Sequence, residues 1–271
     1  MRLGVAGLGL IGGSLALALR KRHEVRGYDV ARETRDAARA AGLGIVDTLE
    51  ALLPADAIIV ATPMTAVLPT LAALAPRAET AVLLDVASVR GPVDAFARDQ
   101  SGRARFVGMH PMAGRSETGF AAADPALLIG RPFLVVPTAT SDAPAMAIAG
   151  QIARDAGGVV TVCSAAEHDR IVALVSALPL ALAAALSIAA SEGEADLSTF
   201  AGPGYRDTTR LALTAPDIAE PLLLANSGNV VAAVARLRAV LDELERAIAE
   251  RDAPAVRAFL ARAAGARDRL G

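Results

Sequence analysis

Residues 5–14 read Val-Ala-Gly-Leu-Gly-Leu-Ile-Gly-Gly-Ser and contain the pattern G-x-G-x-x-G at Gly7, Gly9 and Gly12. The apolar residues before the pattern are too few for a helix and predict a short buried strand, whereas Leu10 to Leu19 has the apolar density of a helix. In a strand–turn–helix unit of this kind, Gly7 permits the turn, Gly9 admits a pyrophosphate and Gly12 allows close packing of helix on strand. The pattern therefore predicts a dinucleotide site, although a glycine-rich turn alone is a weak indication.

An acidic residue after the second expected strand bears on the choice of dinucleotide. Asp29 follows Glu24–Tyr28 and lies about 20 positions after the first glycine, where a carboxylate accepts hydrogen bonds from the adenosine ribose and repels a 2'-phosphate. NAD is therefore favoured, and NADP is not excluded because Arg32 could neutralise a 2'-phosphate. The residues expected to contact the cofactor are Gly7, Leu8, Gly9, Leu10, Ile11, Gly12, Asp29, Thr62 and Pro63.

The first part of the chain alternates short apolar runs with helical patterns. This alternation is typical of an α/β fold with a doubly wound, mostly parallel, Rossmann-like sheet. The runs expected to be strands after the first two are Ala57–Ala61, Ala81–Leu84, Phe106–Met109, Phe133–Val136 and Val159–Val162.

After Ser164 the pattern becomes all-helical, which predicts a dinucleotide-binding domain at 1–163 and a helical substrate and dimerisation domain at 164–271. Residues 171–190 carry no charge and are long enough to cross a bilayer. Because Ser176, Pro179 and Ser187 interrupt them, we expect a wholly buried central helix instead of a membrane span. Excess apolar helix surface of this kind suggests a homodimer.

Composition narrows the class of protein. The 27 basic and 29 acidic residues are well mixed and give a net charge of −2. The sequence therefore predicts no positive electrostatic field that would attract nucleic acid or an anionic membrane. Cys163 is the single cysteine, which rules out an internal disulfide, and no cluster of cysteine and histidine predicts a metal. A cytoplasmic enzyme acting on a small molecule fits best.

The chain has three histidines, and His110 is the strongest candidate base. It directly follows the expected strand Phe106–Met109, so it would lie at the carboxyl end of the sheet, where such folds bind ligands. His23 lies in a polar turn and is expected to be exposed. For His168, near the start of the long helix, helix capping and catalysis are equally supported.

Two further groups could bind substrate. Ser88 follows another strand end and would face the same crevice as His110, or else cap the helix that starts near Pro92. Arg206 and Arg210 are four residues apart, so one helix face could bind a dicarboxylate or form an ordinary surface network.

Together these stretches resemble the prephenate and arogenate dehydrogenase family of tyrosine biosynthesis. The resemblance rests on Gly-Leu-Gly-Leu-Ile-Gly-Gly-Ser (7–14), Asp-Val-Ala-Ser-Val-Arg (85–90), Gly-Met-His-Pro-Met-Ala-Gly (108–114), Glu-His-Asp (167–169) and Gly-Tyr-Arg-Asp-Thr-Thr-Arg (204–210).

The resemblance implies an NAD-dependent oxidative decarboxylation of prephenate to 4-hydroxyphenylpyruvate. It assigns His110 to the substrate C4 hydroxyl as a base, with Ser88 sharing that hydroxyl. It assigns Arg210, assisted by Arg206, to a substrate carboxylate, and it adds Ser176 to the substrate site.

One departure from the family leaves the substrate open. Many members carry Ser-His-Leu-Pro-His where this chain reads Ser176-Ala-Leu-Pro-Leu180. A leucine at 180 cannot donate a hydrogen bond to a pyruvyl group or a ring carboxylate. The alternatives are therefore an arogenate-preferring enzyme, a dual-specificity cyclohexadienyl dehydrogenase, an enzyme for an amino-substituted prephenate or, less favoured, a non-catalytic dinucleotide-binding protein.

Overall fold

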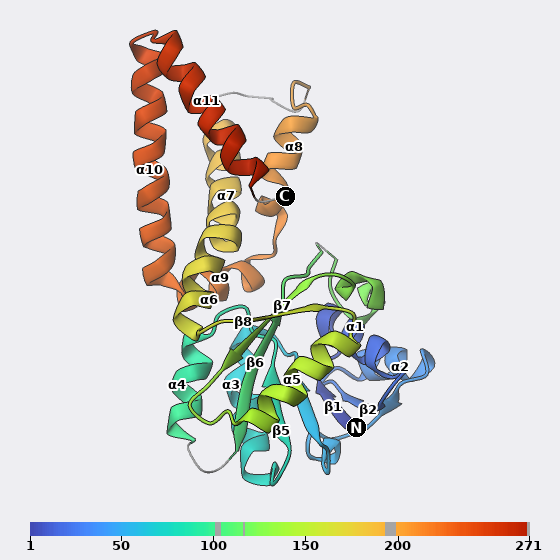
Figure 1. Ribbon diagram of the computed structural model, residues 1–271. Coiled ribbons are helices and arrows are strands. Elements are labelled where there is room, and N and C mark those ends of the chain that lie inside the picture. The colour runs from blue at the N-terminus through green and yellow to red at the C-terminus, as the bar shows by residue number, and fades with distance from the viewer. Residues whose placement is uncertain (101–103, 116, 193–198, 270–271) are drawn as a thin grey trace. The chain divides into compact units, whose positions relative to one another are not determined.

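A computed structural model describes residues 1–100, 104–115, 117–192 and 199–269 (Figure 1). By its internal contacts the chain forms two units, Met1–Asn226 and Ser227–Gly271. The helices of residues 165–225 thus belong with the sheet, whereas the sequence pattern places a division at residue 163. All candidate site residues lie in the first unit.

The first unit is built on an eight-stranded sheet of order β3-β2-β1-β4-β5-β6-β7-β8. Neighbouring strands are parallel except for β6 and β7, which pair antiparallel with His110 opposite Leu134. The expectation of a doubly wound, mostly parallel sheet is confirmed. The strands are β1 (Arg2–Ala6), β2 (Glu24–Tyr28), β3 (Gly44–Ile45), β4 (Ala57–Val60), β5 (Val82–Asp85), β6 (Arg105–Pro111), β7 (Pro132–Pro137) and β8 (Val159–Val162).

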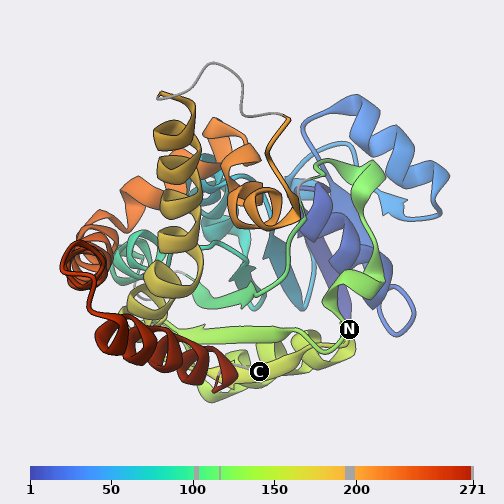
Figure 2. The ribbon, with the colours of Figure 1, turned by 90° about the horizontal axis from the view of Figure 1, so that it is seen from above.

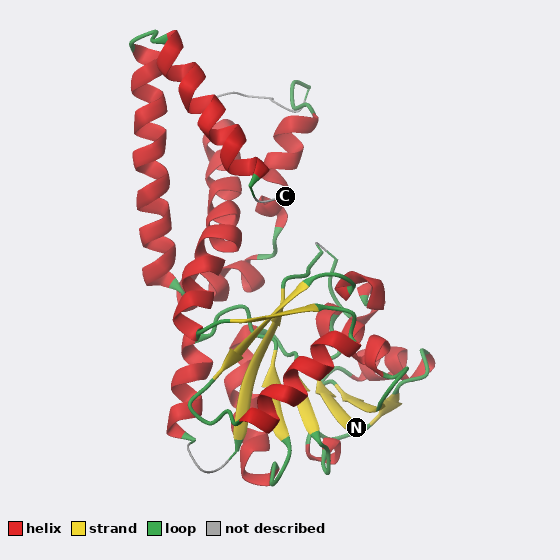
Figure 3. Cartoon of the chain, in the orientation of Figure 1, coloured by secondary structure: helices red, strands yellow, loops and turns green. Residues whose placement is uncertain are grey.

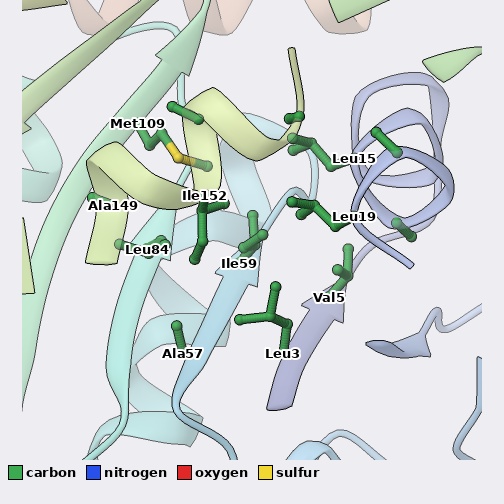
Figure 4. Packing of buried hydrophobic residues seen from close by; sticks show 14 of the residues in the cluster. Leu3, Val5, Leu15, Leu19, Ala57, Ile59, Leu84, Met109, Ala149 and Ile152 are labelled. Carbon is green, nitrogen blue, oxygen red and sulfur yellow. The ribbon is translucent and has the colours of Figure 1, made fainter. Parts of the chain in front are cut away.

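Helices cover both faces of this sheet, so its central strands are apolar on both sides. Helices α1 (Leu10–Leu19) and α5 (Ala143–Asp155) pack on one face, and α3 (Met64–Leu74) and α4 (Gly91–Asp99) on the other. In the hydrophobic cluster on the face that α1 and α5 cover, Leu15 and Leu19 of α1 lie near Val5 and Ile59 of the strands (Figure 4). Each such side chain stabilises the fold by about 1.5–3 kcal/mol. Helix α2 (Arg32–Ala40) follows β2 and has only Ala38 buried.

The chain beyond β8 is helical, as Figure 3 shows by colour. Helix α6 (Ala165–Val172), a π-helical segment at Ala173–Ala177 and α7 (Leu178–Ser191) run end to end (Figures 1 and 2). Two short helices, α8 (Pro203–Thr209) and α9 (Pro216–Ala225), complete the unit.

The expectation that the long apolar helix is wholly buried is wrong for the single chain. Residues 165–191 are long and apolar enough to cross a membrane, but only 28% of their most apolar 18-residue window is buried. Val175 and Ile188 are 52% and 56% exposed. The pattern predicts an apolar surface, and the fold of one chain leaves part of that surface uncovered.

The second unit is a helical hairpin. Helix α10 (Ser227–Ala249) and helix α11 (Ala253–Asp268) contact each other near the turn that joins them, where Arg262 pairs with Glu243, and α11 then slants away from α10 (Figure 1). Asp252 accepts a hydrogen bond from the backbone N–H of Ala255 and so caps the start of α11.

Candidate active site

The glycines of residues 7–12 shape the loop between β1 and α1. Gly7 has φ of +89°, which favours glycine, and a Cβ there would lie 2.7 Å from the carbonyl oxygen of Ala61. A Cβ on Gly12 would collide with the carbonyl oxygen of Gly7. A Cβ on Gly9, in contrast, would meet no atom within 4 Å among the described residues. Gly7 and Gly12 are thus required by the fold, while Gly9 leaves open space in front of the helix.

The start of α1 is suited to an anion. No side chain of the described chain caps it, and its first backbone bond runs from Gly13 N to Gly9 O. The N–H groups of its first turn, including those of Leu10 and Ile11, therefore face the open space with the positive end of the helix dipole. A cofactor pyrophosphate fits this end of the helix.

Asp29 is held at the end of β2 by two backbone donors. Its Oδ2 accepts from Leu8 N at 2.8 Å and its Oδ1 from Ala31 N at 2.9 Å. Leu8 thus contributes its N–H group to this site, whereas its side chain is fully buried in the core. This geometry fixes the carboxylate beside the glycine loop, where ribose hydroxyls would reach it.

Thr62 and Pro63 follow β4 at the point where the strand order reverses, which is where doubly wound sheets bind ligands. Within the described residues, the buried Oγ1 of Thr62 has no hydrogen-bond partner. A buried hydroxyl without a partner costs free energy, so a bound ligand is its natural partner. Open space at Gly9, the uncapped helix and this hydroxyl together fit a dinucleotide.

His110 is the second-last residue of β6 and is linked to α6 through a second histidine. Its Nδ1 lies 2.9 Å from Nε2 of His168, whose Nδ1 lies 2.8 Å from Oδ1 of Asp169. His110 is 9% exposed and His168 is completely buried. The result is a continuous chain of hydrogen bonds from strand β6 to helix α6.

Asp169 also accepts hydrogen bonds from backbone N–H groups at the start of helix α4. Its Oδ1 accepts from Arg90 N at 2.7 Å, and its Oδ2 accepts from Gly91 N at 2.8 Å. Burial, the largest single cause, raises the pKa of Asp169, but the hydrogen bonds from His168, Arg90 and Gly91 together outweigh it and lower that pKa below its usual value. The carboxylate is therefore ionised and accepts the proton of His168 Nδ1.

The surroundings keep His110 neutral. Burial is the largest cause that lowers the pKa of His110 to about 3, followed by His168 and Arg90, while Asp169 opposes them. When Nδ1 of His168 donates to Asp169, Nε2 of His168 can accept from His110, which then carries its proton on Nδ1. Its Nε2 then has a free lone pair, which is what a general base requires.

The other predicted residues are placed as follows. Ser88 is half-buried in the loop after β5 and does not cap α4, whose N-cap is Arg90. Ser176 lies in the π-helical segment, a distortion common at functional sites, and Leu180 is buried in α7.

Arg206 lies in α8 and Arg210 opens the 3₁₀ turn that follows, and both residues are exposed. Both elements pack against α7. Arg206 donates to the carbonyl oxygen of Ala201. Among the described residues, no hydrogen bond or ion pair joins either arginine to His110.

The structure joins His168, for which the sequence supported capping and catalysis equally, to Asp169, to which the sequence analysis assigned no separate role. Ser164, not His168, caps α6, since its Oγ accepts from Glu167 N. The available indication was the run Glu167-His168-Asp169 near the start of the long helix. The prediction that His23 is exposed is wrong, because its side chain is 8% exposed and its Nε2 lies 2.9 Å from Oδ2 of Asp155.

A doubly wound fold with an open phosphate-binding helix and a histidine at a strand end defines a dinucleotide-dependent enzyme. Comparison with known proteins identifies its family. Residues 15–162 match the family model "Prephenate dehydrogenase, nucleotide-binding domain", and residues 164–262 match "Prephenate dehydrogenase, dimerization domain". The chain belongs to the prephenate dehydrogenase family.

Individual relatives agree with this assignment. Prephenate dehydrogenase of Bacillus subtilis is 33% identical over 242 residues, which cover 84% of this chain and 64% of that protein. The crystal structure of Synechocystis arogenate dehydrogenase is 32% identical, with a TM-score of 0.87 and full coverage of both chains. That of prephenate dehydrogenase from A. aeolicus, in complex with hydroxyphenyl propionate and NAD+, is 26% identical, with a TM-score of 0.92 over 99% of this chain and 98% of that one.

Proposed function

We propose that this protein is an NAD-dependent prephenate dehydrogenase that converts prephenate to 4-hydroxyphenylpyruvate and carbon dioxide. The observation that carries the proposal is the hydrogen-bonded chain from His110 through His168 to Asp169, which presents a neutral base at the carboxyl end of the sheet. NAD, when bound, accepts a hydride from C4 of the substrate ring. The start of α1 would hold its pyrophosphate and Asp29 its adenosine ribose, with Thr62 as a further polar contact.

The base acts on the substrate hydroxyl. His110 Nε2 accepts the hydrogen bond of the C4 hydroxyl and takes its proton as the C4–H bond breaks. Proton transfer of this kind contributes about 10²–10⁴-fold to the rate. The bond between C1 and the carboxylate then breaks, its electron pair completes the aromatic ring, and the phenol oxygen regains the proton. Atoms and electrons balance with one hydride lost to the cofactor and one carbon dioxide released.

Ser88 and the arginines orient the substrate in this proposal. Ser88 lies after β5, next to the strand that bears His110, and shares the C4 hydroxyl. Arg210, with help from Arg206, binds a substrate carboxylate, which a guanidinium can hold bidentately. Ser176 contributes a hydroxyl from the distorted helix.

A second candidate is an arogenate or dual-specificity cyclohexadienyl dehydrogenase. Leu180 favours it, because the buried leucine offers no donor to the pyruvyl group that distinguishes prephenate. The 32% identity to an arogenate dehydrogenase over the whole chain supports the same alternative. The chemistry at C4 and C1 is unchanged, so only the side-chain pocket differs.

Turnover on each substrate tests both candidates. The purified protein should reduce NAD with prephenate, and His110→Asn should lose most of kcat while its dissociation constant for NAD stays within about twofold. An unaffected His110→Asn enzyme would remove the mechanism. The ratio of kcat/KM for prephenate and arogenate then decides between the two substrates.

We also propose that the enzyme is a cytoplasmic homodimer. A second copy would cover the apolar residues that α6 and α7 leave exposed, and residues 164–262 match a dimerization domain. Ile188→Glu should convert the dimer to a monomer in light scattering, because a charge cannot be buried unpaired in such an interface. A monomeric wild-type protein would contradict this proposal.

A further inference from the structure

Arg90 and Asp85 form a buried ion pair behind the proposed base. Both side chains are 1% exposed, and the guanidinium contacts both carboxylate oxygens, at 2.5 and 2.7 Å. Asp85 ends strand β5 and also accepts from Ala87 N at 3.0 Å. The pair therefore ties together both ends of the short segment that carries Ser88.

The guanidinium also lies against strand β6. A Cβ on Gly108 would come within 2.5 Å of its central carbon, so only glycine lets the guanidinium reach this place. Gly108 is two residues before His110 in the same strand. Contact with strand β6, which carries the proposed base, thus helps to hold the Arg90 guanidinium in place.

The backbone of Arg90 reaches a third element. Its N–H donates to Oδ1 of Asp169, the same oxygen that accepts from His168. One residue therefore joins the Ser88 segment, the His110 strand and the Asp169–His168 pair.

Stability alone is a poor explanation for this arrangement. Burying two charges costs desolvation free energy, and apolar residues of similar volume often serve a fold equally well. Moreover, Nε of Arg90 is buried without a partner among the described residues, which is an added cost.

We propose that Arg90 is a positioning residue of the reaction, which holds Ser88 and the His110–His168–Asp169 chain in one geometry. The proposal rests on the proposed function, since it concerns the placement of that base and that hydroxyl. Arg90 touches neither substrate nor cofactor in this scheme and acts through its three neighbours.

Its charge adds an electrostatic effect. The charged and titratable groups that face His110 are His168 and Asp169 from α6 and Arg90 from the start of α4. The cation disfavours a second positive charge and lowers the pKa of His110, so loss of that cation should raise the pKa.

Two substitutions separate geometry from charge. Arg90→Lys keeps the charge but cannot contact both carboxylate oxygens, whereas Arg90→Met loses both properties. We expect both variants to lower kcat at least tenfold with the NAD dissociation constant within about twofold. Only Arg90→Met should also raise the pKa of His110. An NMR titration of the His110 ring in the protein without substrate measures this pKa.

Gly108→Ala provides an independent probe through a double-mutant cycle. It should lower kcat in the wild type, because the new methyl group displaces the guanidinium. It should have little further effect in Arg90→Met, where a flexible apolar side chain can move away. Leu71→Ala, on the buried face of α3, is the control for lost stability alone.

The outcomes are distinguishable. If kcat falls in Arg90→Lys only as far as in a Leu71→Ala protein of equal melting temperature, or if Gly108→Ala and Arg90→Met are additive, Arg90 is structural and the proposal fails. If the wild type turns over none of the substrates, the proposed function fails. The NMR titration and its response to Arg90→Met then still decide whether Arg90 controls His110.

Discussion

His110 and His168 are joined by a hydrogen bond of 2.9 Å between Nδ1 of the first and Nε2 of the second, although they lie 58 residues apart in the chain. Their ring centroids are 5.1 Å apart and the rings are tilted by 55°. This contact connects the sheet to helix α6 at the point where chemistry is proposed. It makes the base dependent on a residue from a different structural element.

Removing that contact should impair catalysis without removing the cofactor. In His168→Leu, His110 loses the acceptor that fixes its tautomer, and we expect kcat to fall about 10²-fold or more. His168→Gln places an amide near the former Nε2 and should retain more activity than His168→Leu. The measurement is the initial rate of NADH formation at saturating substrate, together with NAD binding.

His23→Gln is the matched control for this pair, because His23 bonds Asp155 at another place in the unit. It should keep full activity. Equal kcat values for His168→Leu and the wild type would mean that His110 needs no partner.

The buried, neutral His110 should make the protein sensitive to acid. In the unfolded chain a histidine binds a proton near pH 6.5, whereas burial lowers the pKa of folded His110 to about 3. Between these values the unfolded state binds more protons, so the free energy of unfolding decreases as the pH falls, by up to about 1.4 kcal/mol per pH unit. Urea unfolding at pH 7 and pH 5 measures this decrease.

His110→Asn removes the titrating ring and should reduce the decrease by the share of one proton. Ser88→Ala changes the same site without removing a titrating group, so it should keep the wild-type dependence on pH. A His110→Asn protein with the same acid sensitivity as the wild type would show that His110 is not the group responsible.

The sheet could be predicted from sequence because its evidence is local. Apolar runs such as Ala57–Val60 are bounded by turn residues, and the glycine loop fixes the order of strand and helix. The two-residue strand β3 was missed because so short a strand has no period. The role of His168 stayed open between capping and catalysis for a different reason: its partner His110 is distant in sequence, and one sequence by itself carries no record of that pairing.

Two glycines of the loop should have different roles: Gly12 is needed for the fold, and Gly9 only for binding NAD. A Cβ at Gly12 collides with the Gly7 carbonyl, so Gly12→Ala should lower the melting temperature and NAD binding together. A Cβ at Gly9 meets no described atom within 4 Å, so Gly9→Ala should keep the wild-type melting temperature. It should nevertheless weaken NAD binding, because the methyl group occupies the space proposed for the pyrophosphate. Thermal unfolding with and without NAD measures both effects, and undiminished NAD binding by Gly9→Ala would place the pyrophosphate elsewhere.

Asp29 should determine the choice between NAD and NADP. A hydrogen bond between its carboxylate and a ribose hydroxyl contributes about 1.5–3 kcal/mol, and the same charge repels a 2'-phosphate. Arg32 is available nearby: its side chain is 83% exposed and its ion pair with Asp36, at 3.6 Å, is a weak surface contact. Asp29→Ser should therefore raise the ratio of kcat/KM for NADP to that for NAD at least tenfold.

Adding Arg32→Ala to Asp29→Ser should cancel most of that gain, since the cation that would bind the phosphate is lost. Arg26→Ala is the matched control, because Arg26 is an arginine of strand β2 whose side chain pairs with Glu24. It should leave the ratio unchanged in the Asp29→Ser background. If Asp29→Ser alone leaves the ratio at its wild-type value, the discrimination arises from another part of the nucleotide site, since neither loss of the carboxylate nor the neighbouring cation would then affect binding of the 2'-phosphate.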